Sequence, residues 1–240
     1  MIKNLFLTIC CVLVLSGCSA FSQSSGEVDE KIWANCEKPL EPMYDPVEDE
    51  VQKVMREAGE KEDWMGAVPK LQKIIDDGIA EHEFAENSIL REEIDMCIFK
   101  CMVIARKTDE ALKFAESREI PSVKEALAKG KGKKFKKESN LVVLEAATLA
   151  KYGLKGKGMA KMDAYLKRSD VPTEERQFVM FARALASFDP PGSPEIVIKR
   201  LEETRDVDPE SDLGKLCADQ AKEAKVKLEE LKKAGKLPTE

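Results

Sequence analysis

Apolar residues recur along most of this chain at intervals of three and four positions, which is the period of an amphipathic α-helix. From Pro46 onward, short polar or glycine-containing breaks separate these stretches, so we expect successive helices joined by short connections. The pattern predicts helix pairs over 51–75, 89–115, 141–166 and 178–201, and a last amphipathic helix over 211–234. The apolar positions that define the first two pairs are Val51, Val54, Met55, Ala58, Ala67, Val68, Leu71, Ile74 and Ile75, then Ile89, Ile94, Cys97, Ile98, Cys101, Ile104, Ala111, Leu112 and Ala115. Strand-like alternation is nearly absent, so the sequence predicts an all-α protein.

The N-terminal pattern is different, because Lys3 precedes a continuous apolar run from Leu5 to Leu15. This run has about 11 residues, whereas a helix that crosses a bilayer needs roughly 20, so it indicates a removable export signal. The run ends in Leu15-Ser16-Gly17-Cys18, which resembles the lipobox of bacterial lipoproteins. The remaining alternative is an ordinary signal peptide followed by a coincidental cysteine.

The lipobox resemblance implies that residues 1–17 are a signal peptide and that the mature chain begins at Cys18. It also implies a diacylglycerol on the Cys18 sulfur and an acyl chain such as palmitate on the new amino terminus. Two or more acyl chains hold a protein at a membrane, whereas one binds marginally. Ser19 rather than Asp follows the cysteine, which by the sorting habits of that family implies the outer membrane facing the periplasm, if the source has one.

The segment 18–46 has the composition of a tether. It combines serines and a glycine with acidic residues and then Pro39, Pro42 and Pro46, and such a segment buries little apolar surface. We therefore expect a lipidated N-terminus and tether over 18–46. Within this segment, 30–46 is expected to lie against the domain, because Trp33 is a large aromatic residue.

Small residues at matching places in the predicted pairs resemble tetratricopeptide repeats, in which a small residue of the second helix lets it approach the first. The matching residues are Ala67 and Leu71, Ala111 and Ala115, Ala160 and Ala164 with Pro172, and Val197 and Leu201 with Pro209. The resemblance implies a tetratricopeptide-like α-solenoid of stacked antiparallel helix hairpins over 47–210, with 211–240 as a capping helix and tail. A three- or four-helix bundle is the competing arrangement.

Composition supports helices, because charged residues make up 35% of the chain and aromatic residues only 6%. The net charge of −6 conceals an uneven distribution, since 27–63 holds 13 acidic and 5 basic residues and 124–168 holds 13 basic and 4 acidic residues. In the basic stretch, the candidate anion-binding residues are Lys131, Lys133, Lys134, Lys136 and Lys137. They predict either a surface for anionic lipids, envelope polymers or an acidic partner protein, or lysines that only stabilise helix ends.

Catalytic signals are weak in this sequence. His82 is the single histidine and has no identifiable partner, and the chain has neither a Gly-x-Ser-x-Gly motif nor a phosphate-binding glycine loop. We therefore expect no enzyme, cofactor, bound metal or small-molecule substrate. A helical enzyme that uses carboxylates, such as a lytic glycosidase, is the remote alternative.

Cys36, Cys97, Cys101 and Cys217 remain once the signal is removed and Cys18 is acylated. Cys97 and Cys101 lie four apart on one predicted helix, too far apart to bond each other and surrounded by apolar residues, so buried free thiols are expected. Cys36 and Cys217 are candidates for a disulfide that pins the tether to the last helix. A zinc site with four thiolate ligands is supported only by the number of remaining cysteines.

The sequence therefore predicts a membrane-anchored envelope lipoprotein that serves as a protein–protein interaction scaffold, with an unidentified envelope protein as its partner. The alternative is an envelope-binding module that uses its basic loops on anionic lipid or polymer. Nucleic acid is not an expected partner, because the chain is predicted to be exported.

Overall fold

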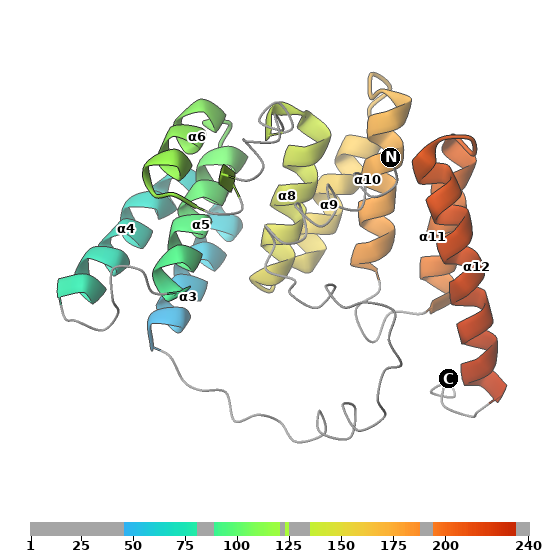
Figure 1. Ribbon diagram of the computed structural model, residues 1–240, viewed down its shortest axis with the longest axis horizontal. Coiled ribbons are helices and arrows are strands. Elements are labelled where there is room, and N and C mark those ends of the chain that lie inside the picture. The colour runs from blue at the N-terminus through green and yellow to red at the C-terminus, as the bar shows by residue number, and fades with distance from the viewer. Residues whose placement is uncertain (1–45, 81–88, 121–122, 125–134, 188–193, 234–240) are drawn as a thin grey trace. The chain divides into compact units, whose positions relative to one another are not determined.

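The computed structural model describes residues 46–80, 89–120, 123–124, 135–187 and 194–233. These residues form nine α-helices that pack as sequential antiparallel pairs (Figure 1). The helices are α3 (Pro46–Lys61), α4 (Trp64–Ala80), α5 (Ile89–Ile104), α6 (Thr108–Ser117), α8 (Glu138–Lys151), α9 (Lys155–Leu166), α10 (Thr173–Ala186), α11 (Pro194–Val207) and α12 (Asp212–Lys233). The prediction of an all-α protein with helices at these places in the sequence is confirmed.

The described residues divide into two compact units. The N-terminal unit contains the described residues of 46–124, which form α3 to α6, together with 151–153. The C-terminal unit contains 135–150 and the described residues from 154 to 233, and so most of α8 and all of α9 to α12. Each unit has buried apolar residues of its own.

In the N-terminal unit, each helix packs against the next along the chain: α3 on α4, α4 on α5 and α5 on α6. The most deeply buried large side chains of this unit are Met55, Leu71, Ile75, Ile94, Ile98, Phe99, Val103, Ile120 and Val123. The predicted small positions Ala67, Ala111 and Ala115 are also buried. The helical period in the sequence therefore identifies much of the core of this unit, although Trp64, Phe99 and Val103 are buried without having been predicted.

Three helices of this unit end without glycine. Glu62, Arg106 and Glu119 follow α3, α5 and α6 with φ values of 56°, 66° and 53°, in the left-handed region that residues with a Cβ rarely adopt. After the first of these turns, the backbone N–H of Gly66 donates a hydrogen bond of 2.9 Å to Asp63 Oδ1 and so caps the start of α4. Helix ends of this kind carry no glycine signal in the sequence.

In the C-terminal unit, α8 and α9 approach closely at Gly158. A Cβ on Gly158 would lie 2.6 Å from the carbonyl oxygen of Ala146 on α8, which is closer than carbon and oxygen can approach without a shift of the backbone. Gly158, Met162 and Tyr165 form the buried face of α9. The glycine therefore determines how near the two helices lie.

This contact corrects one part of the repeat prediction. Ala160 and Ala164 were predicted as the small residues of α9 that approach its partner, but both are exposed. The prediction was wrong because α9 carries small residues on two faces, and the face with Gly158 is the one that packs on α8. The corresponding positions Val197 and Leu201 on α11 are buried as predicted.

The later helices of this unit are joined through Gln177, a buried residue of α10. Its side-chain amide donates hydrogen bonds to the carbonyl oxygens of Thr204 and Asp208, at 3.1 and 3.0 Å, near the end of α11. Its amide oxygen accepts a hydrogen bond of 2.7 Å from the Ser211 hydroxyl, and the same hydroxyl oxygen accepts one of 2.9 Å from the N–H of Gly214 in α12. One side chain thus links α10 to the connection between α11 and α12.

Candidate functional site

The lipidation site and much of the predicted basic cluster lie outside the described residues. Cys18 and Cys36, and also Lys131, Lys133 and Lys134, fall in the ranges that the structure does not describe. The lipid anchor and the disulfide between Cys36 and Cys217 therefore stay predictions. His82 also lies outside the described residues.

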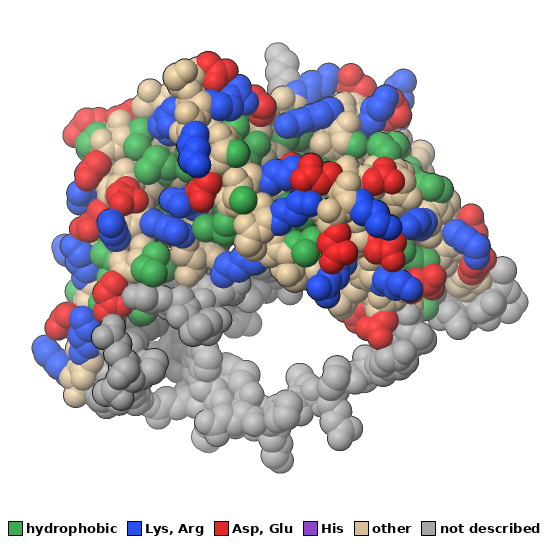
Figure 2. All heavy atoms as spheres, turned by 180° about the vertical axis from the view of Figure 1, so that it is seen from behind, with side chains coloured by type: hydrophobic (Ala, Val, Ile, Leu, Met, Phe, Trp, Pro, Cys, Tyr) green, Lys and Arg blue, Asp and Glu red, His purple; other side chains and the backbone are tan. Residues whose placement is uncertain are grey.

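Several described lysines of the basic stretch have partners. Lys137 lies 3.7 Å from a carboxylate oxygen of Glu174, and Lys161 lies 3.0 Å from one of Glu145. Lys136 is exposed and also has an interaction within the protein. On the face in Figure 2, basic and acidic side chains are mixed rather than separated into blocks. This arrangement favours structural roles for these lysines over a free anion-binding surface.

The thiols of Cys97 and Cys101 are free and buried on α5, as predicted. Cys97 Sγ and the Tyr152 hydroxyl are hydrogen-bonded at 3.2 Å, and the Cys101 thiol donates to Met55 Sδ at 3.5 Å. Burial raises the pKa of Cys101 and of Tyr152, so both groups stay protonated near neutral pH. Burial also raises the pKa of Cys217, on α12, to about 12.

Lys100 lies between these two cysteines in the sequence and is itself buried, with only 4% of its surface exposed. Burial is the largest cause that lowers the pKa of Lys100 to about 8, and the charge of Lys151 acts in the same direction. In the described part of the chain, no carboxylate oxygen lies within 4.0 Å of its ammonium group. Lys100 is the most unusual ionisable side chain of the N-terminal unit.

Asp95, one turn earlier on α5, is a second buried charge. Its two carboxylate oxygens lie 3.7 Å from Nε of Arg118 and 3.9 Å from Nε of Arg91. Burial raises the pKa of Asp95, and the two guanidinium groups oppose that shift. Arg118 also donates a 3.0 Å hydrogen bond to Gln72 on α4 and lies over the ring of Phe114, so this group of side chains holds α4, α5 and α6 together.

Sequence reasoning did not identify Lys100 and Asp95 as buried. A signal was present in the sequence. From Ile94 to Ile104 every residue except Asp95 and Lys100 is apolar, so α5 has no polar face for a charged side chain. A charged residue in such a helix is therefore expected to be buried, unless the core ends at that position.

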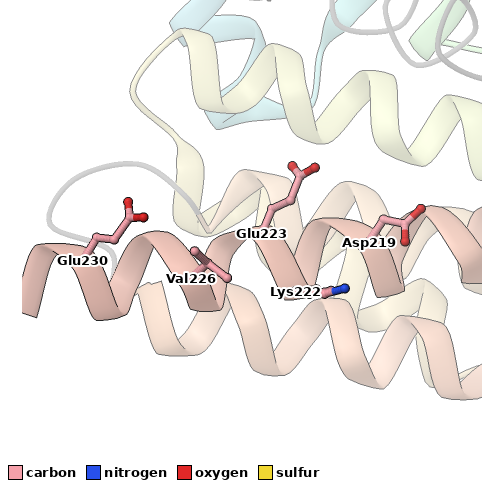
Figure 3. A pocket seen from close by; sticks show the side chains of 5 residues that line it. All are labelled: Asp219, Lys222, Glu223, Val226 and Glu230. Atoms are coloured by element: carbon pink, nitrogen blue, oxygen red, sulfur yellow. The ribbon is translucent and has the colours of Figure 1, made fainter.

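The outer side of α12 carries an open hollow with a volume of about 620 Å³. Its described lining residues all come from this one helix, and Asp219, Glu223 and Glu230 project from the same side of it (Figure 3). The hollow also contains Val226, which is 55% exposed. The surface of this hollow is mostly charged, and the role of α12 as a capping helix stays a prediction.

Two further properties concern only the described part of the chain. None of its helices combines the length and the apolar character that a transmembrane span requires. Within the same ranges, no three His, Cys, Asp or Glu side chains gather closely enough to hold a metal ion.

Comparison with protein-family models, with curated proteins and with solved structures finds no match to this chain.

Proposed function

We propose that the protein is a membrane-anchored envelope lipoprotein that acts as a protein–protein interaction scaffold, with its helix pairs arranged as a tetratricopeptide-like array. The observation that carries this proposal is the packing of the described helices as sequential antiparallel pairs. Helix pairs that stack in chain order bury their apolar faces on their neighbours and leave an extended surface for a partner. The lipobox Leu15-Ser16-Gly17-Cys18 supports the envelope address.

The described lysines support the scaffold over an anion-binding module. Lys137 and Lys161 already lie beside carboxylates, and each would have to give up that partner in order to bind an external anion. The Lys137 pair is exposed and the Lys161 pair is half-buried, and exposed ion pairs are individually weak, at about 0–1 kcal/mol, so the arrangement of the charges and not a large energy favours the scaffold.

The anchor is tested by replacing the acylated residue. In cells fed labelled palmitate, the full chain is expected to incorporate the label and to partition into the detergent phase, because two or more acyl chains outweigh the polar surface of the protein. The Cys18→Ala variant is expected to lose both properties. A Cys36→Ala variant is the matched control, and it should keep the label. Equal labelling of the wild type and Cys18→Ala would contradict the anchor.

The scaffold is tested by photo-crosslinking in native envelopes. A photoreactive residue is placed in the full chain at one of several exposed helix positions, Lys113 on α6, Lys199 on α11 or Val226 on α12. The proposal expects a subset of the positions to give one discrete adduct with the same protein, because a partner covers a defined surface. The Cys18→Ala chain reports which adducts form without the anchor. Diffuse adducts from every position would contradict a scaffold.

A further inference from the structure

Three buried sulfur atoms lie close together in the core of the N-terminal unit. The Sγ of Cys101 on α5 lies 3.5 Å from the Sδ of Met55 on α3. Cys97 precedes Cys101 by one helical turn, so both thiols lie on the same face of α5, and they are near enough to interact electrostatically. Met55 and Cys101 are fully buried, and Cys97 is 5% exposed. Two thiols and one thioether therefore share a site away from bulk water.

This set of donors fits a soft metal ion. Thiolate and thioether sulfurs select Cu(I), whereas hard cations such as Mg²⁺ take oxygen ligands. With a metal–sulfur bond of about 2.3 Å, the length found for zinc, two ligands at a trigonal angle lie about 4 Å apart. The sulfurs of Cys101 and Met55 are 3.5 Å apart, so a trigonal ion needs only a small separation of the two side chains. The third donor is a methionine, so the group differs from the clusters of His, Cys, Asp or Glu that the described residues lack.

The buried charge of Lys100 supplies the balance that such a site needs. Two thiolates and one Cu(I) ion carry one net negative charge, which is costly in an apolar core unless a positive group lies nearby. Lys100 lies between the two cysteines on α5 and is itself buried, and both cysteines act electrostatically on its ammonium. No described carboxylate lies within ion-pair distance of this ammonium. A bound metal would give the lysine a close negative partner.

Tyr152 supports the deprotonated form of Cys97. Its hydroxyl is hydrogen-bonded to Cys97 Sγ at 3.2 Å, and burial raises the pKa of the hydroxyl, which therefore keeps its proton. A thiolate has no proton to donate, so in a metal-bound site the hydroxyl donates and the sulfur accepts. Hydrogen bonds of this kind orient metal ligands and adjust their affinity. Tyr152 belongs to the same unit as the two cysteines.

We propose that Met55, Cys97 and Cys101 form a binding site for one Cu(I) ion, with Lys100 as the counter-charge. On binding, the two thiols release their protons to the solvent, and the ion forms bonds to both thiolates and to the thioether. Copper keeps its oxidation state, so the step needs neither an oxidant nor a reductant. Because the ligands are buried, the ion is expected to enter while the unit folds, as metal binding and folding are coupled. The site is independent of the scaffold function.

Competition with a coloured chelator tests this site on the full chain in detergent. The reduced protein is unfolded in urea and refolded without oxygen in the presence of Cu(I) as its bicinchoninate complex. We expect the refolded protein to withdraw one Cu(I) per chain, measured as the loss of the visible absorption of the complex. Retention of all the copper by the chelator would overturn the proposal.

X-ray absorption at the copper edge of the loaded wild type is the second measurement, and it needs no substitution that could prevent folding. It should show three sulfur neighbours around the ion. Copper with only two sulfur neighbours, or with nitrogen or oxygen neighbours, would contradict the assignment of the three ligands.

Variants then identify the ligands, and circular dichroism reports whether each variant is folded. Met55→Leu keeps a similar volume without the thioether, and it should weaken Cu(I) binding roughly tenfold or more, at least as much as the loss of an outer partner of a metal ligand. Cys101→Ala should abolish the binding of one ion per chain. Cys217→Ala is the matched control, because it removes a buried free thiol on α12, and it should bind copper like the wild type. Equal affinity of Met55→Leu and the wild type, or loss of binding in a folded Cys217→Ala chain, would overturn the site.

Discussion

At the scale of single residues, the ammonium group of Lys100 works against folding. The unfolded chain returns this amine to water, where its pKa is about 10.4, while the folded protein lowers the pKa to about 8. Between these two values the unfolded state binds more protons than the folded state, so the contribution of Lys100 to stability improves as the pH rises through this window. Below about pH 8 the full cost of burying the charge remains.

The Lys100→Met variant is therefore expected to be more stable than the wild type at pH 7, by roughly 1–3 kcal/mol, because Met keeps the packing and removes the buried charge. The gain should shrink between about pH 8 and 10.5. Urea unfolding at pH 7 and at pH 10 measures both effects, and Lys113→Met, at an exposed site, is the control that should change stability little. A variant less stable than the wild type at pH 7 would show that Lys100 has a compensating partner.

Asp95 and Lys100 also show the limit of sequence reasoning at this scale. The predicted positions Ile94, Cys97, Ile98, Cys101 and Ile104 are buried, because helical spacing is a property of the sequence itself, but Phe99 and Val103 are also buried and were not predicted. Burial of these two charged residues depends on how α4 and α6 cover α5, and on Arg91 and Arg118 lying near Asp95. The contact with Arg91 lies within α5, whereas the contact with Arg118 and the cover by α4 and α6 arise only when the helices pack.

At the scale of helices, the contact between α8 and α9 is fixed by the absence of a side chain at Gly158. We expect Gly158→Ala to cost about 1–3 kcal/mol of unfolding free energy, because its methyl group would lie 2.6 Å from a backbone oxygen of Ala146, which has no rotamer with which to move away. Gly156 lies two residues earlier on α9, and a Cβ there would meet nothing within 4 Å.

Gly156→Ala is therefore the matched control, and it should be neutral or stabilise the protein by up to about 1 kcal/mol, since alanine is the better helix former. Thermal or denaturant unfolding of the two variants gives the comparison. Equal effects of the two substitutions would show that the close approach of α8 and α9 at Gly158 does not limit their packing.

Gln177 gives a second prediction for the helices. Its buried amide hydrogen-bonds to the carbonyl oxygens of Thr204 and Asp208 and to the hydroxyl of Ser211, so Gln177→Ala would remove three buried hydrogen bonds, of which the Ser211 hydroxyl could replace one through the Asp208 carbonyl. A loss of about 2–4 kcal/mol is expected. Gln52→Ala, at an exposed position on α3, should cost far less. Denaturant unfolding of the two variants measures the difference, and a small effect at position 177 would mean that water replaces the amide.

The positions of the helices along the chain could be predicted. Which side of each helix is buried could be predicted only in part. Ala160 and Ala164 match the spacing of a repeat, yet Gly158, Met162 and Tyr165 are the residues of α9 that are buried. Several small residues on one short helix allow more than one packing face. The shape of the α8 surface determines which of those faces packs against it. The spacing of residues within α9 carries no information about that surface.

At the scale of the whole molecule, the proposed function combines a lipid anchor at Cys18 with a series of helix pairs. In this proposal the N-terminal lipobox supplies the address, and the helices supply surfaces that a partner can cover. The two parts make separate predictions, since loss of the anchor would move the protein without changing its folded helices. The basic stretch supplies the competing account, in which lysines bind an anionic surface and salt weakens the attachment.

The most direct measurement is the stoichiometry of the protein crosslinked to this chain in native envelopes, at low and at high salt. It compares the wild type with a variant in which Lys131, Lys133, Lys134, Lys136 and Lys137 are all replaced by Gln. The account predicts one envelope protein in a fixed ratio to this chain, recovered equally from both forms and little affected by salt. Loss of that protein from the variant, or its loss at high salt from the wild type, would contradict the scaffold and assign the binding to the lysines.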